Sequence, residues 1–230
     1  MTKKVAVLQS NYIPWKGYFD LINSVDVFVI YDLVQYTKND WRNRNQIIAG
    51  GKPTWLTIPV RQERLDQRID ETRVADPRWA KKHWRTIEQS YSKSPGFAQF
   101  GHSIGDSLMG CANEPLLSSV NLRMINMLCS QMEIDTKIIS SDEFDLPEDR
   151  VDRLVHICKQ LDAEEYVSGP AAWIYLDEGR FNKEGLKVSW YEYDGYPEYA
   201  QKSEDFSHFV SVLDVLFCTG SSFRNFMTSF

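Results

Sequence analysis

The stretch KVAVLQSNYIPWKGYFDLINSVDVFVIYD, residues 4–32, decides the fold. It contains two short apolar runs rich in β-branched residues, at 4–8 and 25–31, and such runs predict buried strands of a parallel sheet. Residues 16–23, between the two runs, are long enough for a short helix. Strand, helix and strand in this order predict a right-handed βαβ unit, whose ligands bind beyond the carboxyl ends of its strands.

The rest of the chain continues this alternation of strands and helices. Strands are expected over 54–60, 136–140, 165–168 and 187–193, the last an outer strand, and helices over 78–91, 115–132, 151–161 and 206–217, the last ending at Gly220. These elements predict an α/β fold with a parallel-sheet, Rossmann-like, three-layer core and additional helices. A single α/β domain over residues 1–230 is expected, with a small helical subdomain around residues 76–133 as the alternative.

The composition is that of an ordinary globular protein. Of the 230 residues, 43% are hydrophobic and 25% are charged, which excludes a disordered tail, a collagen-like rod and a membrane-inserted bundle. The first residues, MTKKVAVLQS, lack the apolar stretch and cleavage site of a signal peptide, so a cytoplasmic location is expected. The four cysteines are widely spaced without a Cys-x-x-Cys pair, so neither a disulfide framework nor a zinc site is expected.

The charge of the chain indicates the kind of partner. A net charge of -6 argues against DNA as a partner, because nucleic-acid binding uses a basic surface to displace counterions. Basic residues are nevertheless dense between residues 41 and 85, whereas residues 142–149 are acidic. Local basicity on an acidic protein favours a small anionic ligand, such as a nucleotide or sugar nucleotide. A solvated, arginine-rich loop is an equally good interpretation.

The segment QSNYIPWKGYF, residues 9–19, follows the first strand and begins the first helix. Such a turn directs backbone N–H groups and the positive end of the helix at an anion in the crevice. Gly17 gives a ligand room to approach closely. The candidate binding residues in this segment are Gln9, Asn11, Tyr12, Trp15, Gly17 and Tyr18, with Lys16 as a candidate catalytic cation. The alternative for the aromatic residues is that they pack the helix against the sheet.

The segment DLVQYTKNDWRNRN, residues 32–45, follows the second strand and is crowded with polar groups. Arg42 and Arg44 are candidate clamps for phosphate or carboxylate, because the planar guanidinium binds both oxygens of such groups. Asp32 or Asp40 is a candidate catalytic base, orienting group or metal ligand. The other candidate binding residues here are Gln35, Asn39, Trp41 and Asn43.

A third candidate segment is YVSGPAAWIYLD, residues 166–177, at the end of a later strand. Ser168 and Gly169 can present a hydroxyl and backbone amides to a ligand, and Asp177 can add a polar contact. The alternative is a helix start that needs only the Gly-Pro geometry. The sequence contains no phosphate loop, no Gly-x-Gly-x-x-Gly, no zinc-protease motif and no Gly-x-Ser-x-Gly, so no metal ligand is assigned. The four histidines are far apart, and each is interpreted as structural.

Several separated motifs together resemble the WbqC-like family. They are VAVLQSNYIPWKGYFDLI, VFVIYDLVQYTKNDWRNRNQI, YVSGPAAWIYLDEGRF and VLDVLFCTG, and they run through nearly the whole chain. Members of that family are found with enzymes of O-antigen and other surface-polysaccharide synthesis. The resemblance implies a role in modifying a nucleotide-linked amino sugar by attaching glycine or a related acyl group. The residues that match the family's motifs include all the candidate binding residues named above.

A second, partial resemblance concerns the first strand-to-helix turn. Class I synthetase-type and adenylyl-transferring folds carry His-x-Gly-His there, and this chain has Trp15-Lys16-Gly17-Tyr18. It departs from the pattern at both histidines, which puts nucleotidyl transfer by that route in doubt, although Lys16 offers a cation. Ser221, Ser222 and Arg224 are similar to the late signature of those folds.

These observations lead to three functional hypotheses. The first is an enzyme that acylates or aminoacylates the amine of a nucleotide-linked amino sugar, with Asp32 or Asp40 as the base and Arg42 and Arg44 on the diphosphate. Three forms of the activated acyl or amino-acid donor are left open: an adenylate made from ATP with magnesium, an acyl thioester, and a charged tRNA. The alternatives are a divergent nucleotidyltransferase that uses the first turn, and a non-catalytic sugar-nucleotide-binding protein. Exposed aromatic residues fit a homodimer interface as well as a pocket.

Overall fold

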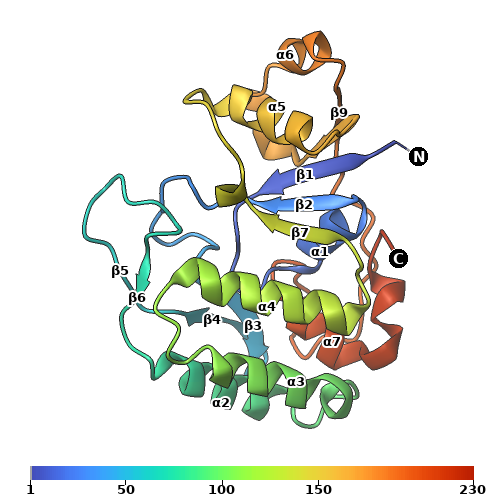
Figure 1. Cartoon of the computed structure of the whole chain (residues 1–230). Helices are drawn as coiled ribbons and strands as arrows, with labels where there is room; N and C mark the ends of the chain where they lie inside the picture. The colour runs from blue at the N-terminus through green and yellow to red at the C-terminus, as the bar shows by residue number, and fades with distance from the viewer. Residues whose placement is uncertain (1) are drawn as a thin grey trace.

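The central sheet consists, in spatial order, of β7 (Lys137–Ser140), β2 (Val27–Ile30), β1 (Lys4–Leu8), β8 (Glu165–Ser168) and β9 (Lys187–Trp190), all parallel (Figure 1). The computed structural model describes residues 2–230. In the register of the sheet, Val5 lies opposite Val27 on one side and opposite Tyr166 on the other. The predicted α/β fold with a Rossmann-like, three-layer core is confirmed.

The path of the chain reverses direction across the sheet between β1 and β8. From β1 the chain passes through α1 (Lys16–Asn23) to β2 on one side, which confirms the predicted βαβ unit. Later it returns through α5 (Arg150–Gln160) to β8, which pairs with the other side of β1. Ligands of open α/β sheets bind beyond the carboxyl ends of the strands at such a point.

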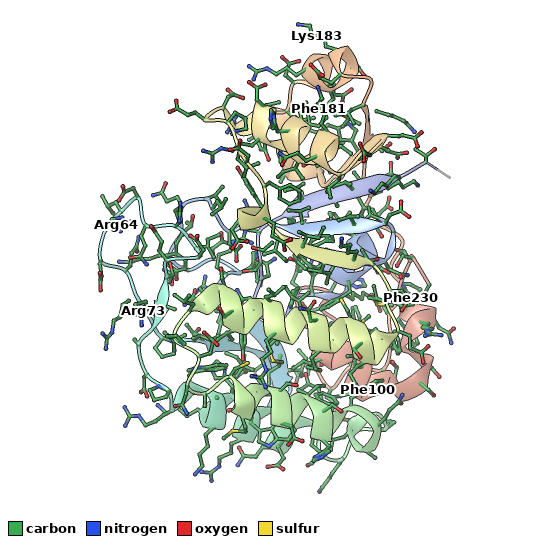
Figure 2. All side chains as sticks on the ribbon, viewed as in Figure 1. Arg64, Arg73, Phe100, Phe181, Lys183 and Phe230 are labelled. Carbon is green, nitrogen blue, oxygen red and sulfur yellow. The ribbon has the colours of Figure 1, made fainter. Side chains whose placement is uncertain are left out.

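The two faces of the sheet are covered by different helices. Ala6 of β1 points to the face covered by α1, α4 (Leu117–Met132) and α7 (Val212–Thr219), with which it shares one apolar core. Val5 points to the other face, which is covered by α5 and α6 (Glu178–Lys183). Phe181 of α6, labelled in Figure 2, stacks on Tyr166 of β8, and the ring centroids are 5.1 Å apart. The alternation of side chains along β1 therefore builds both cores.

A β-hairpin outside the parallel sheet replaces the expected strand over 54–60. It pairs β3 (Arg44–Ala49) antiparallel with β4 (Lys52–Thr57). Gly50 and Gly51 make the turn with φ values of +61° and +79°, in the left-handed region that favours glycine. The prediction of a further strand here was wrong in its bounds, and β3 was missed because its first residues are polar.

The longer helices after the first βαβ unit are partly those that the periodicity predicted. The helices expected over 78–91, 115–132 and 151–161 are confirmed as α2 (Trp79–Tyr91), α4 and α5. The helix α3 (Phe97–Gly110) was not predicted, because its three glycines are untypical of a helix. One of them is needed for packing, since a Cβ on Gly105 would lie 2.8 Å from the Trp84 ring.

The last expected helix begins later than predicted. The structure places its start at Val212 rather than residue 206, with the Ser211 hydroxyl accepting a hydrogen bond from the Leu213 N–H at 3.3 Å. Residues 191–211, here called the connecting segment, are irregular and link β9 to α7. The expected end at Gly220 is confirmed, since Gly220 follows α7 with a φ of +57°.

The remaining short elements are β5 (Val60–Arg61) paired with β6 (Arg73–Val74), and the 3₁₀ turns η1 (Ser141–Glu143), η2 (Pro170–Ile174) and η3 (Gly220–Phe226). Within residues 2–230, no helix has the length and apolar character that crossing a membrane requires.

Candidate functional site

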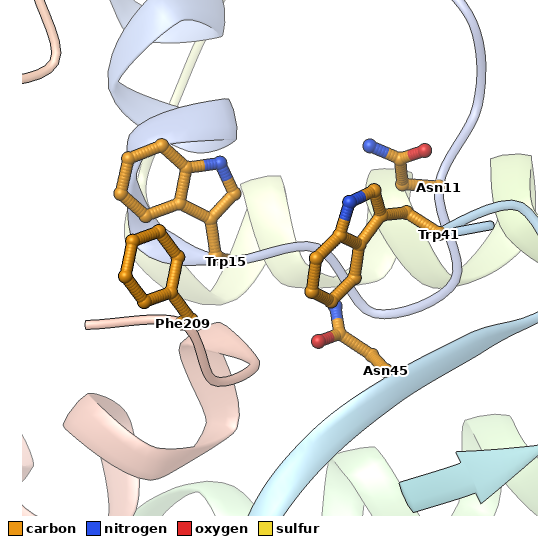
Figure 3. Close-up of a pocket in the computed structure, with 5 residues that line it drawn as sticks. All are labelled: Asn11, Trp15, Trp41, Asn45 and Phe209. Carbon is orange, nitrogen blue, oxygen red and sulfur yellow. The ribbon is translucent and has the colours of Figure 1, made fainter. Parts of the chain in front are cut away.

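A cavity of about 240 Å³ lies between the loop after β1 and the start of the hairpin. Trp15 and Phe209 form one side of it, and Trp41, Asn11 and Asn45 form the other (Figure 3). Three of these five side chains are aromatic and two carry amides. The cavity therefore combines flat apolar walls with a few directed polar groups, as ligand pockets do.

A second cavity, of about 450 Å³, continues from the first across Trp15 and Phe209, which line both. It adds residues of the connecting segment: Tyr193, Asp194, Gly195, Tyr196 and His208. We call the two cavities together the aromatic cleft. Trp15 packs against Tyr193 and Tyr196 with ring centroids 5.4 and 5.6 Å away, so the wall between the two cavities is itself aromatic.

The loop that carries Asn11 and Trp15 is fixed from the hairpin side. The buried amide of Asn45 donates hydrogen bonds to the carbonyls of Tyr12 and Ile13, at 3.1 and 2.9 Å. Ile13 has a φ of +36°, which is uncommon for a β-branched residue and is held by these bonds. Asn45 thus positions the loop as well as lining the cleft.

Gly17 makes room for Trp15. A Cβ at position 17 would lie 2.4 Å from Cζ2 of the Trp15 indole, which folds back over the first turn of α1. The predicted role of Gly17 was to let a ligand approach. The structure gives the space to Trp15 instead, so Gly17 affects the cleft only through the position of that ring.

Lys16 lies behind the wall of the cleft. Its side chain is buried, with the amine 4.7 Å from the centre of the Tyr196 ring and 5.4 Å from that of Tyr199, and it donates to the Pro197 carbonyl at 3.3 Å. Burial lowers the pKa of this amine from 10.5 to about 8, although the nearby carboxylates of Asp20 and Asp214 oppose the shift. The structure therefore holds Lys16 under the connecting segment.

Asp214 of α7 anchors the connecting segment. Its fully buried carboxylate accepts hydrogen bonds from the hydroxyls of Tyr91 and Tyr199, at 2.5 and 2.8 Å, and from the Gln201 amide at 2.7 Å. Tyr199 and Gln201 both belong to the segment. The connecting segment, which covers Lys16, is thus hydrogen-bonded directly to the core.

Asp32 lies in a hydrogen-bonded network beside the aromatic cleft. Its carboxylate accepts from the Ser10 N–H at 2.8 Å, from the Ser10 hydroxyl at 2.7 Å and from the Ser118 hydroxyl. Burial raises the pKa of Asp32 and these hydrogen bonds oppose the rise. It borders a different cavity, of about 330 Å³, between the ends of β2 and β7. The structure thus places this candidate base outside the aromatic cleft.

The other predicted charged residues already have partners. Asp40 forms an ion pair with Arg42 at 3.6 Å and accepts from the Trp41 N–H at 2.7 Å. Arg42 also donates to the Ser10 carbonyl and to the Asn11 side-chain oxygen. Arg44 donates to Asn39 and lies 4.2 Å from the centre of the Trp55 ring. Neither arginine lines the aromatic cleft, so both orient neighbouring residues rather than facing it.

Two predicted tyrosines of the first loop belong to the core. Tyr12 is fully buried, and its hydroxyl is 2.8 Å from Nδ1 of His83, whose Nε2 is 3.2 Å from the Thr57 carbonyl. Burial lowers the pKa of His83 to about 4, so the ring is neutral at pH 7 and accepts from Tyr12. Tyr18 is also buried and donates to the Gln9 carbonyl at 3.0 Å. Both tyrosines stabilise the loop from within.

Three predicted amides fix loops. Gln35 donates to the Leu65 carbonyl at 2.6 Å, and Asn43 donates to the Ile58 carbonyl at 2.8 Å. Asn39 adopts a φ of +58° and accepts from Arg44. The structure does not bring these amides into the aromatic cleft.

The third predicted segment is divided by the structure. Ser168 is buried at the end of β8, and a Cβ on the next residue, Gly169, would lie 3.4 Å from the Tyr193 ring of the cleft. Asp177 has a different role, because it caps α6 by accepting from the Gly179 N–H at 3.0 Å. Gln9 lines a cavity on the opposite side of the sheet.

Seven residues of the cleft were missed from the sequence: Asn45, Tyr193, Asp194, Gly195, Tyr196, His208 and Phe209. Six of these belong to the connecting segment, which is far from the first loop in the sequence. The signal that could have indicated them is the density of aromatic residues between positions 191 and 209 without helical spacing.

Comparison with known proteins gives two matches. A family model described as the WbqC-like protein family matches residues 9–225. The chain is also similar to Uncharacterized protein Rv1507c of Mycobacterium tuberculosis (strain ATCC 25618 / H37Rv), with 43% identity over 226 residues, which cover 98% of this chain and 97% of the relative. No solved structure matches the chain. The range matched by the family contains every residue that lines the aromatic cleft.

Proposed function

The chain belongs to the WbqC-like protein family, and on that premise we propose that it is an enzyme of surface-polysaccharide (O-antigen) synthesis. In this proposal the enzyme transfers an acyl or aminoacyl group, of the glycyl type, to the amine of a nucleotide-linked amino sugar. The aromatic cleft binds this substrate.

The observation that carries the proposal is the chemistry of the aromatic cleft. Aromatic faces such as those of Trp15 and Trp41 stack on the apolar faces of sugar rings and on bases. The Asn11 side-chain oxygen accepts from Arg42, which leaves the amide N–H groups of Asn11 as donors for a ligand hydroxyl or phosphate. Stacking walls with oriented amide donors suit a sugar nucleotide better than a purely apolar ligand.

The reaction needs a base, and we assign this role to His208. In the transfer, the amine nitrogen bonds to the carbonyl carbon of the activated donor, the leaving group departs with its electron pair, and the nitrogen loses a proton. His208 lines the cleft, whereas Asp32 and Asp40 do not. Burial and the nearby charge of Lys16 lower the pKa of His208, so its ring is neutral at pH 7 and can take the proton.

The proposal is tested by a transfer assay. The purified protein is incubated with nucleotide-linked amino sugars and, in turn, with ATP, magnesium and glycine, with acyl thioesters, and with glycyl-tRNA. Mass spectrometry is expected to show a product heavier by one acyl group, which His208→Ala abolishes and the exposed control His102→Ala retains.

Two other results would contradict acyl transfer. Release of pyrophosphate from a nucleoside triphosphate without an amine acceptor would instead support a nucleotidyltransferase. Tight binding of a sugar nucleotide without turnover with any donor would support a non-catalytic binding protein.

A further inference from the structure

A separate cavity of about 250 Å³ opens on the other face of the sheet, against α5. Its walls come from the ends of β1, β2 and β8, from α5 and from the segment after η2. The residues that line it include Gln9, Arg150, Leu154, Tyr166 and Tyr175. None of them lines the aromatic cleft, so the two sites are distinct.

The position of this cavity in the fold is the one at which open α/β sheets bind ligands. Gln9 directly follows β1, and Tyr166 lies in β8, the strand that pairs with the other side of β1. The chain path reverses between these two strands, which leaves a crevice beyond their carboxyl ends. Topology alone therefore favours a small-molecule site here.

Arg150 supplies an available positive charge at the cavity. Its guanidinium stacks on the Tyr175 ring, 4.1 Å from the ring centre. Within residues 2–230 it makes no ion pair, whereas the neighbouring Arg180 binds Asp149 and Asp152 at 2.6 and 2.9 Å. Because Arg180 neutralises the nearby acids, the N–H groups of Arg150 remain free to bind a phosphate.

The rest of the cavity suits a flat ring with polar edges. Leu154 and Tyr166 are buried and form an apolar floor, and Tyr175 is 37% exposed. The Gln9 side-chain amide makes no hydrogen bond with any residue from 2 to 230, so it can both donate to and accept from a heterocycle. A ligand with its nucleobase against this apolar floor and its phosphate on Arg150 would use both the apolar and the polar groups of the cavity.

We propose that the cavity between β1, β8 and α5 binds a nucleoside phosphate. The binding site itself does not depend on acyl transfer. Its use as the site of the nucleotide that activates the acyl donor rests on the proposed function.

Isothermal titration of the full chain with AMP, ATP and inorganic phosphate tests the assignment. AMP and ATP are expected to bind, and phosphate alone to bind at least about tenfold more weakly. Arg150→Ala is expected to weaken AMP binding about tenfold or more, because a charge-assisted contact is lost. Leu154→Trp fills the cavity and is expected to abolish binding. Lys159→Ala, which removes a charge from the far end of α5, is the matched control and is expected to bind normally.

The assignment is overturned if neither nucleotide binds the wild-type protein, or if Arg150→Ala and Leu154→Trp both bind AMP as the wild type does. It is also overturned if Trp15→Ala, and not Arg150→Ala, removes AMP binding, since the nucleotide then occupies the aromatic cleft. A parallel titration with a nucleotide-linked amino sugar separates the two proposals. If the wild-type protein binds AMP but not the nucleotide-linked amino sugar, the proposed function is contradicted and the nucleoside phosphate site is retained.

Discussion

Replacing Lys16 with methionine is expected to make the protein more stable at neutral pH. The Lys16 amine is buried under the rings of Tyr196 and Tyr199. Lys16 is also the first residue of α1, where the positive end of the helix disfavours a cation. Methionine is close to lysine in size and fills the same apolar space without a charge to desolvate.

The magnitude follows from the pKa of Lys16. Burial lowers this pKa from 10.5 to about 8, so charging the amine costs about 3 kcal/mol more in the folded than in the unfolded protein. At pH 7 the amine is charged in both states, and the folded protein carries the whole cost. Between pH 8 and 10.5 the folded protein has lost this proton while the unfolded chain keeps it, so the stability of the wild type rises with pH. At pH 9.5 about 1.4 kcal/mol of the cost remains.

Urea unfolding at pH 7 and pH 9.5 measures this difference. Lys16→Met is expected to unfold with a free energy up to about 3 kcal/mol above the wild type at pH 7, and the gap is expected to shrink by about half at pH 9.5. Lys81→Met, at an exposed position of α2, is the control and is expected to show no such pH dependence. A variant less stable than the wild type by the same amount at both pH values would refute the reasoning.

Three further changes are expected to have distinct effects. Gly17→Ala pushes the Trp15 ring out of its place and is expected to weaken sugar-nucleotide binding about tenfold in a titration, whereas an unchanged affinity would show that the ring position is irrelevant. Asp32→Asn places an amide N–H group where the carboxylate accepts hydrogen bonds from the Ser10 N–H and hydroxyl, so two donors face each other. Urea unfolding is expected to show a free energy of unfolding lower by about 2–3 kcal/mol, and a loss below about 0.5 kcal/mol would contradict this. Tyr199→Phe removes a hydrogen bond to Asp214 and is expected to speed proteolytic cleavage within residues 191–211, and an unchanged cleavage rate would show that this bond does not hold the segment.

The parallel strands were predictable because their signal is local. The runs at β1 and β2 are apolar and rich in β-branched residues, since both faces of a parallel sheet are buried. The signal failed where tertiary packing overrides it. The glycines of α3 are untypical of a helix, yet Gly105 allows the close approach of Trp84.

The aromatic cleft was only partly predictable for a related reason. Tyr12 and Trp15 belong to the same loop, yet the structure buries the first in the core and turns the second into the cleft. Sequence spacing does not separate these roles. His208 was interpreted as structural because the four histidines are far apart in the sequence. The start of α7 at Val212, later than residue 206, leaves His208 in the connecting segment, where it lines the cleft.

The central claim is that the aromatic cleft binds a nucleotide-linked amino sugar, and a direct titration of wild type and Trp15→Ala tests it. Trp173→Ala is the control, because Trp173 is exposed and lines neither part of the cleft. The account predicts saturable binding to the wild type and to Trp173→Ala, and binding weakened about tenfold or more in Trp15→Ala. Absence of binding to the wild type across a panel of such sugars, or equal binding by all three proteins, would contradict it.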